Sequence, residues 1–337
     1  MGGTRVHCGD LSPLQNFNAE SERTMRVLKL ILRAMLVMAG ASAGMAGAAV
    51  DNPNEMANEY ITIGDMAKGF SEYNLPQINS LSGKKITLYF GDGEGGFAVE
   101  HDFVSDRVLQ WKVIAGPEKG ASGYSEYIAT NPKDGYYYVE FITGSNQAKM
   151  VALVLDTRRS IATAVLGHFP KEKDDQLSMY QRSSKKLPLA ASRVQILNAS
   201  IGVPMSKNTA RHDLDSKDLV GKRKLYQYSA NDAYEHIYHD NNNFSWHCVS
   251  GNEKGLADTD YSRIIKFEDN FYMIVWVEKV MHVVSAITLN FDTMRSSGAM
   301  ASFSEWDYGE VVNVSSGAII KNLPGVTSKD LELPGKK

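Results

Sequence analysis

The sequence predicts an all-β protein in which two copies of one small antiparallel β-barrel follow each other along the chain, joined by a polar connector. Three observations support this fold class. The body of the chain repeats itself at a constant spacing, it is built from short alternating runs of β-branched and aromatic residues, and Gly, Asp and Asn separate these runs. No strong helical periodicity competes with this pattern. A β-sandwich is the alternative arrangement for each copy.

The repeat is clearest in two segments that lie 135 residues apart. The first, EHDFVSDRVLQWKVIAGPEKG, covers residues 100–120, and the second, EHIYHDNNNFSWHCVSGNEKG, covers 235–255. Both open with Glu-His and close with Glu-Lys-Gly, and Trp111 of the first matches Trp246 of the second. Because the closing motif occurs in both copies, we interpret it as a turn-forming element rather than a chemical one.

A second match extends the repeat and sets the domain limits. DGYYYVEF at 134–141 aligns with DNFYMIVW at 269–276 at the same spacing. We expect the first barrel at 75–170, a charged connector at 171–214 and the second barrel at 215–320. One apolar piece of the connector, RVQILNASIGVP, can return a strand to the first copy.

Each strand of the first copy is recognised by its alternation and by the turn residues that follow it. In chain order the strand patterns are ITLYF, FAVEHDF, VLQWKVI, YYYVEFI and MVALVLD. Successive hairpins over about 90 residues favour a closed barrel, since closure removes exposed strand edges.

Alternation along each strand also predicts which side chains face the barrel interior. The inward residues of the first copy are then Ile86, Leu88, Phe90, Phe97, Val99, His101, Phe103, Leu109, Trp111, Val113, Tyr137, Val139, Phe141 and Thr143. These residues are nearly all apolar. We therefore expect a hydrophobic core inside the first barrel.

The same faces of the second copy carry polar groups. Its inward residues are Lys224, Tyr226, Tyr228, Tyr234, His236, Tyr238, Phe244, Trp246, Cys248, Tyr272, Ile274, Trp276 and Glu278. Burying a carboxylate, an imidazole and several phenols costs a few kcal/mol each unless they are hydrogen-bonded. We therefore predict that the second barrel lines its interior with these residues to hold a small-molecule ligand. The alternative is that they satisfy one another, or ordered water, in a loosely packed barrel.

The cluster of histidines in the second copy does not predict a metal site. His236 is expected to face inward, whereas Glu235, His239 and His247 are expected to face outward or lie on the hairpin tip, so three histidines do not share one face. We expect no metal and no cofactor. Asn241–Asn243 as the turn would pair His236 with Cys248, and a turn one residue different would place His236 opposite His247.

Two further features of this copy keep alternative interpretations. A His–Cys pair could act as nucleophile and base, although a lone buried cysteine such as Cys248 is more often an apolar filler. The segment ADTD at 257–260 occurs only in the second copy, and it either closes the cavity mouth or forms an exposed acidic turn.

Composition limits the classes of partner. The chain has 337 residues, 43% of them hydrophobic and 22% charged, which suits a soluble globular protein of one large or two ordinary domains with a real core. The formal net charge of −3 gives no electrostatic attraction to nucleic acid or to an anionic membrane. The two cysteines are Cys8 and Cys248, and only the second is expected in the mature chain, so no intramolecular disulfide is expected.

The N-terminus has the pattern of a secretory signal peptide. From Met25 the sequence reads MRVLKLILRAMLVMAGASAGMAGAAVDN, a basic start followed by an apolar segment and small residues. We expect residues 1–48 to be a leader and signal peptide, with cleavage after Ala48 or, as the alternative, after Ala43. The mature protein is then periplasmic or secreted and free of the membrane. A membrane anchor is disfavoured because the uncharged run is short and rich in small residues.

The tandem layout and the run YSANDAYEHIYHDNNNFSWHCVSGNEKGLADTD at 228–260 resemble the molybdenum cofactor biosynthesis protein F (MoaF) family. This resemblance covers most of the chain after about residue 60. It implies two tandem lipocalin-like barrels of the calycin type. The family name associates such proteins with cofactor biosynthesis but does not by itself specify a reaction.

A more distant resemblance links the second copy to the phenolic acid decarboxylases, which are single lipocalin-like barrels. LYQYSANDAYEHIY resembles their opening hairpin, and IVWVE resembles the strand that carries their catalytic glutamate. By this resemblance Tyr226 and Tyr228 would hold a substrate carboxylate and Glu278 would be the acid/base. The family also uses an arginine just after the third strand, where this sequence has Leu256 and, as the nearest cation, Lys254.

Three hypotheses of function follow from the sequence. The first is an exported protein that binds a small aromatic or amphipathic molecule in its second barrel. The second is a cofactor-independent lyase or isomerase that uses the same residues. In the third, both barrels are filled and the function lies on an outer surface.

Overall fold

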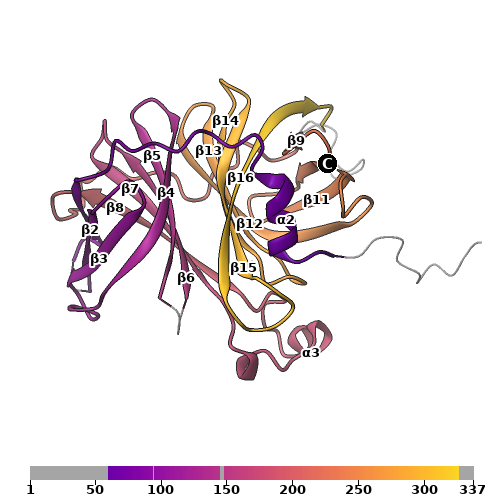
Figure 1. The fold of residues 1–337 in the computed structure, drawn as a ribbon, viewed down its shortest axis with the longest axis horizontal. Helices are drawn as coiled ribbons and strands as arrows, with labels where there is room; N and C mark the ends of the chain where they lie inside the picture. The colour runs from indigo at the N-terminus through magenta and orange to yellow at the C-terminus, as the bar shows by residue number, and fades with distance from the viewer. Residues whose placement is uncertain (1–59, 94, 145–147, 326–337) are drawn as a thin grey trace, which may run out of the picture. The chain divides into compact units, whose positions relative to one another are not determined.

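The described residues form two closed antiparallel β-barrels in tandem (Figure 1). The computed structural model describes residues 60–93, 95–144 and 148–325. The predicted fold class is therefore confirmed, and the β-sandwich alternative is wrong, because each sheet closes on itself. The predicted leader and signal peptide at 1–48 lies outside the described residues.

The first barrel takes its last strand from the predicted connector. Its strands are β1 (Lys85–Phe90), β2 (Phe97–Phe103), β3 (Val108–Ala115), β4 (Ser122–Lys133), β5 (Tyr136–Thr143), β6 (Lys149–Asp156), β7 (Ile161–His168) and β8 (Arg193–Ile201). β8 pairs with β7 along its length and with β1 through Ile201 and Leu88, which closes the barrel. The prediction that the connector returns a strand to the first copy is confirmed.

The second barrel repeats this plan. Its strands are β9 (Arg223–Gln227), β10 (Ala233–Tyr238), β11 (Asn243–Ser250), β12 (Ala257–Glu268), β13 (Phe271–Val277), β14 (Val284–Asn290), β15 (Arg295–Phe303) and β16 (Val311–Leu323). The last strand, β16, pairs with β9 and closes the barrel. The segment ADTD is the start of β12 rather than a turn, so the interpretation as an exposed acidic turn is wrong.

The helical elements of the described residues are short, and the first of them belongs to the second barrel. They are α2 (Ile63–Phe70), the 3-10 turn η1 (Glu172–Asp174) and α3 (Met179–Ser184). Thr62 caps α2 by accepting a hydrogen bond from the backbone N–H of Asp65 at 3.2 Å. Ile63, Met66 and Phe70 follow at helical spacing and are buried in the core of the second barrel. In the part of the chain that the structure describes, no helix is both long and apolar enough to span a bilayer.

The predicted inward faces of both barrels are confirmed. In the first barrel, Leu88, Phe103 and Leu109 are fully buried in one hydrophobic core. In the second, the inward tyrosines and tryptophans form another core with Cys248. Period-two alternation therefore identifies the interior of each barrel from local sequence alone.

A third core lies between the barrels and joins their outer faces. It contains Tyr138 of β5, Met150 of β6 and Ala286 of β14. The hydroxyl of Tyr138 donates to the carbonyl of Ala286 at 2.9 Å across this contact. Strands β13 and β14 are therefore buried on both faces.

The hairpin of β10 and β11 adopts a register that neither sequence alternative contains. His236 pairs with Trp246, not with Cys248 or His247. Asp240 closes the tip by accepting hydrogen bonds from the backbone N–H groups of Asn242 and Asn243. Both sequence alternatives assumed a different turn and are therefore wrong. In the hairpin that forms, His236 and Cys248 do not lie opposite each other.

Candidate functional site

The second barrel encloses a chamber of aromatic rings around His236. The imidazole lies 4.2 Å from the Tyr226 ring, 5.1 Å from Phe244 and 6.0 Å from Trp276, measured between ring centroids. Burial lowers the pKa of His236 to about 3, so the ring is neutral at physiological pH. Its Nδ1 is buried and has no hydrogen-bond partner. The inward position predicted for His236 is confirmed.

The tyrosines divide between two parts of the chamber. The hydroxyls of Tyr226 and Tyr238 form a hydrogen bond of 2.6 Å with each other, and both rings are fully buried. Tyr272 donates to Asp218 at 3.0 Å, away from the small cavity of this barrel. The predicted site residues that line that cavity are Tyr228, Tyr234, His236, Trp246, Trp276 and Glu278.

Two buried carboxyl groups lie among these rings. Trp276 Nε1 donates to Glu278 Oε1 at 3.1 Å, and Trp246 Nε1 donates to Asp260 Oδ2 at 2.9 Å. Burial, reinforced by the charge of Asp260, raises the pKa of Glu278 well above its usual range. Burial also raises the pKa of Asp260 to about 6, although Lys279 Nζ lies 3.7 Å from Oδ1. Glu278 is therefore protonated at neutral pH, whereas Asp260, with a pKa of about 6, is mostly ionised there.

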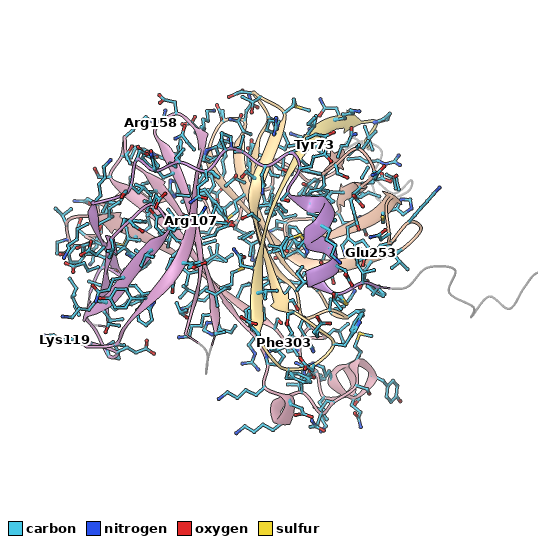
Figure 2. The ribbon with its side chains drawn as sticks, in the orientation of Figure 1. Tyr73, Arg107, Lys119, Arg158, Glu253 and Phe303 are labelled. Atoms are coloured by element: carbon cyan, nitrogen blue, oxygen red, sulfur yellow. The ribbon has the colours of Figure 1, made fainter. Side chains whose placement is uncertain are left out.

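A third acidic group comes from the repeated Glu-Lys-Gly turn. Both copies form the predicted turn, with Gly120 and Gly255 at φ of +99° and +95°. Glu253 of the second copy is also buried, and it accepts from the Tyr234 hydroxyl at 2.7 Å and from the backbone N–H of Ile61 at 3.3 Å. Figure 2 labels Glu253 beside α2. The sequence predicted Glu253 only as part of a turn, and it did not predict that this side chain is buried and hydrogen-bonded to Tyr234.

Cys248 is a buried free thiol in this barrel wall. Its Sγ donates to the carbonyl of Ser250 at 3.3 Å. Burial raises the pKa of the Cys248 thiol, which disfavours the thiolate that nucleophilic chemistry requires. Cys248 pairs across the strands with Tyr234 rather than with His236. The structure therefore does not place His236 and Cys248 opposite each other, as the hypothesis of a nucleophile–base pair requires.

The open space expected in the second barrel is almost absent. The cavity among the polar residues measures about 20 Å³, room for no more than one water molecule. Met66 and Phe70 of α2 line it from one side, and the Phe70 ring stacks on Tyr228 at 4.3 Å. The polar residues face inward as predicted, but α2 occupies the volume that a ligand would need.

The larger space lies in the first barrel, where a filled hydrophobic core was expected. That cavity measures about 460 Å³ and is lined mostly by apolar side chains. The expectation of a fully packed first barrel is therefore wrong. The inward residues are the predicted ones, but their summed volume does not fill the barrel.

The outward residues of the opening hairpin form an ion cluster in which Glu235 itself is buried. Glu235 pairs with Arg223 and lies 3.5 Å from His247, while His239 contacts Ser245 at 2.7 Å. Within the described ranges no group of three or more His, Cys, Asp or Glu side chains is arranged to hold a metal ion.

The decarboxylase-like residues can be compared with this geometry. Tyr228 and Glu278 line the same small cavity. The Tyr226 ring does not line it but packs against the ring of His236, which does. Leu256, at the place of the family's arginine, packs against the hydrophobic core. Among the described residues that line the cavity there is no lysine or arginine. The tyrosines and the acid are therefore gathered, but the cation is not.

Sequence reasoning missed three contributors to the chamber. Asp258, Asp260 and Ser262 are spaced two residues apart along β12 and therefore share one face of the strand. The strand period could thus have identified Asp260 as an inward residue. Glu253 was missed because it belongs to the Glu-Lys-Gly motif of both copies, which was interpreted only as a turn. The helix α2 was missed because its eight residues lie before the repeat begins.

Comparisons with known proteins agree with the tandem architecture. The family model of the MoaF N-terminal domain matches residues 58–171, and that of the MoaF C-terminal domain matches residues 214–326. The chain is 27% identical to "Protein MoaF" of Klebsiella aerogenes over 266 residues, which cover 78% of this chain and 95% of the relative. A solved Burkholderia vietnamiensis protein, provisionally described as a beta-lactamase, aligns at 12% identity over 32% of this chain and 96% of its own, with a TM-score of 0.27. That score supports no conclusion. The two matching domain models and the near full-length relative show that the chain belongs to the MoaF family.

Proposed function

We propose that this MoaF-family chain binds a small aromatic or amphipathic molecule in its C-terminal barrel. The observation that supports this proposal most directly is the buried pair of carboxyl groups, Glu278 and Asp260, among aromatic rings. At the matching positions the first barrel has Thr143 and Ser125, so the fold itself does not need the acids. Buried acids with raised pKa values are characteristic of functional sites.

Ligand entry requires that α2 leave the chamber. Burial of Ile63, Met66 and Phe70 stabilises the docked helix by roughly 5 to 9 kcal/mol, at 1.5 to 3 kcal/mol for each side chain. An eight-residue helix is not stable alone in water, so α2 would unfold as it leaves. The ligand must offset this cost. We therefore expect weak binding by the unmodified protein.

A lyase or isomerase is the second candidate function, and the position of Glu278 favours it. A protonated carboxyl beside Trp276 can donate a proton to a substrate that replaces α2. Tyr226 of β9 and Tyr228, which follows it, would then orient the substrate from the opposite side of the barrel.

A variant that opens the chamber tests the proposal. We expect the double substitution Met66→Ala and Phe70→Ala to bind 4-hydroxycinnamate at least about tenfold more tightly than the unmodified protein, since less helix burial is lost. Quenching of tryptophan fluorescence measures binding, because Trp246 and Trp276 line the cavity. Lys68→Ala is the matched control, because this α2 side chain is 80% exposed.

The substitution Glu278→Gln in the opened variant separates the two candidates. A binding protein should keep its affinity within a few-fold, whereas an enzyme should lose turnover by about two orders of magnitude. If the opened variant shows no saturable binding and Glu278→Gln only raises stability, the residues form a filled structural core and the proposal is wrong.

We also propose that the protein is exported, on the basis of the predicted signal at 1–48. Sequencing the N-terminus of protein isolated from its own host should find Ala49 as the first residue, or Gly44 if the alternative site is used. An N-terminus at Met1 or Met25 in a cytoplasmic fraction would contradict export.

A further inference from the structure

The cavity of the N-terminal barrel has the size and the walls of a ligand site. Its volume of about 460 Å³ lies within the range of small-molecule pockets. Apolar side chains from six strands make its walls, among them Phe90, Val99, Phe141, Val151, Leu153 and Leu166. Neither family resemblance nor the polar cluster of the other barrel assigns a role to this space.

The lining residues show which end of the cavity is open. Its outer rim comes from the turns between β1 and β2 and between β3 and β4, at Gly95 and Glu118. Lys119, labelled in Figure 2, is in the second of these turns. The other end is closed by Phe103 and Leu109, which are fully buried and do not line the cavity.

Two buried polar atoms lie deep in this cavity without partners. They are Nδ1 of His101 on β2 and Nε1 of Trp111 on β3, two residues that are paired in register across these strands. His101 is only 4% exposed, so water does not satisfy this nitrogen and leaving it unpaired is unfavourable. Burial lowers the pKa of His101 to about 4, so the ring is neutral at physiological pH. Its Nδ1 can then accept a hydrogen bond.

The C-terminal barrel provides a direct comparison at the same positions. There the matching indole, Trp246, donates to Asp260 at 2.9 Å. The residue that corresponds to Asp260 in the N-terminal barrel is Ser125, whose hydroxyl donates instead to the carbonyl of Ile142. The Trp111 indole is therefore left for a group that the protein does not supply.

The mouth of the cavity carries a lysine, Lys149, beside the acidic side chain of Glu118. Lys149 and His168 are a cross-strand pair on its rim, and Arg193 is the next strand neighbour of His168. Burial, followed by the charges of Lys149 and Arg193, lowers the pKa of His168. Lys149 forms no ion pair with a described residue, and Glu118 is the one acidic side chain among the described residues of the lining.

The depth of the cavity, from its rim near Lys149 to His101, limits the length of the ligand. Phe97 at the rim and His101 are four residues apart on β2, which is about 13 Å along the strand. With a strand tilt near 40°, the depth is about 10 Å, the reach of a chain of roughly eight to ten carbons.

We propose that the N-terminal barrel binds an elongated amphipathic carboxylate, with its carboxylate at Lys149 and an inner hydroxyl between His101 and Trp111. A hydroxyl fits both deep atoms, since it accepts from the indole N–H and donates to the imidazole nitrogen. The apolar walls contact the body of the ligand.

Three matched probes test this assignment by calorimetry on the full chain. 10-Hydroxydecanoic acid has both polar ends, decanoic acid lacks the inner hydroxyl, and 1,10-decanediol lacks the carboxylate. We expect the first to bind about tenfold more tightly than either of the others. His101→Phe should remove the advantage of the hydroxyl, and Lys149→Met should remove the advantage of the carboxylate.

Two further variants locate the site. Ala164→Phe places a ring in the cavity and should abolish binding of all three probes. His236→Phe is the matched control, because it lies at the repeat position of His101 in the filled barrel, and it should leave every affinity unchanged.

The proposal is wrong if no probe binds the unmodified protein below about 1 mM, or if Ala164→Phe leaves binding intact. It is also wrong if His101→Phe weakens decanoic acid and 10-hydroxydecanoic acid equally. Loss of binding in His236→Phe would assign the probes to the C-terminal barrel. The outcome therefore does not depend on the function proposed for that barrel.

Discussion

Gly298→Ala is expected to destabilise the protein by about 3 kcal/mol or more, a large share of the roughly 5 to 15 kcal/mol that holds a typical protein folded. Gly298 is a buried residue of β15 and pairs with Ile287 of β14. A Cβ at this position would lie 2.3 Å from the carbonyl oxygen of Ala286 and 2.6 Å from the Cα of Ile287. Both are backbone atoms, so no rotamer change relieves the contact and the two strands must separate.

Denaturant unfolding of Gly298→Ala, followed by circular dichroism, measures this effect. The matched control is Gly93→Ala, because a Cβ at Gly93 meets nothing within 4 Å. The control should unfold at the same denaturant concentration as the unmodified protein or slightly above it, since alanine restricts the unfolded chain. Equal stability of the two variants would show that β14 and β15 are not in contact at this point.

Glu140→Gln is expected to stabilise the protein above neutral pH. Glu140 of β5 is 2% exposed, and it accepts a hydrogen bond from the hydroxyl of Ser315 on β16, in the other barrel. Burial raises the pKa of Glu140 to about 7, although the hydrogen bond from Ser315 opposes this. The carboxyl is therefore protonated in the folded protein at a pH where the unfolded chain has lost that proton.

The sign of the pH dependence follows from this difference in proton binding. Below the unfolded pKa, near 4.5, both states are protonated and Glu140 causes no loss of stability. Between pH 4.5 and about 7 the unfolded chain has released this proton while the folded protein still holds it, so stability falls by about 3 kcal/mol across this range and levels off above it. Glutamine keeps the hydrogen bond and carries no charge, so the variant should lack this loss.

Unfolding free energies of Glu140→Gln and the unmodified protein, measured from pH 5 to pH 8.5, test the prediction. The difference between the two curves isolates Glu140 from the other buried acids and histidines. Glu126→Gln on the neighbouring strand is the control, since this side chain is exposed. Parallel curves for Glu140→Gln and the unmodified protein would place Glu140 in contact with water rather than between the barrels.

The strands and their inward faces could be predicted because alternation is a local property. Tyr226, His236 and Trp276 were placed inside the second barrel from the period of their own strands and from the repeat. The contact between the barrels could not be predicted in the same way. The run MVALVLD is apolar on both faces, and one face of a strand does not show whether it meets another domain.

The hairpin register failed for a related reason. Turn residues indicate that a hairpin exists, but Asp240 and the three asparagines after it are compatible with several loop lengths. The tip that forms depends on the hydrogen bonds that Asp240 makes, and these shift every cross-strand pair by one or two residues.

By itself the sequence determined that this chain is all-β, that it consists of two related barrels, and which side chains face each interior. These properties depend on alternation and repetition, which are written in neighbouring residues. The tertiary structure alone decided which barrel contains open space. A helix at 63–70 fills the polar barrel from far away in the chain, while the apolar barrel stays hollow between His101 and its rim. Volume is the reason, because it is the difference between a barrel's size and everything packed inside it, and no single strand carries that sum.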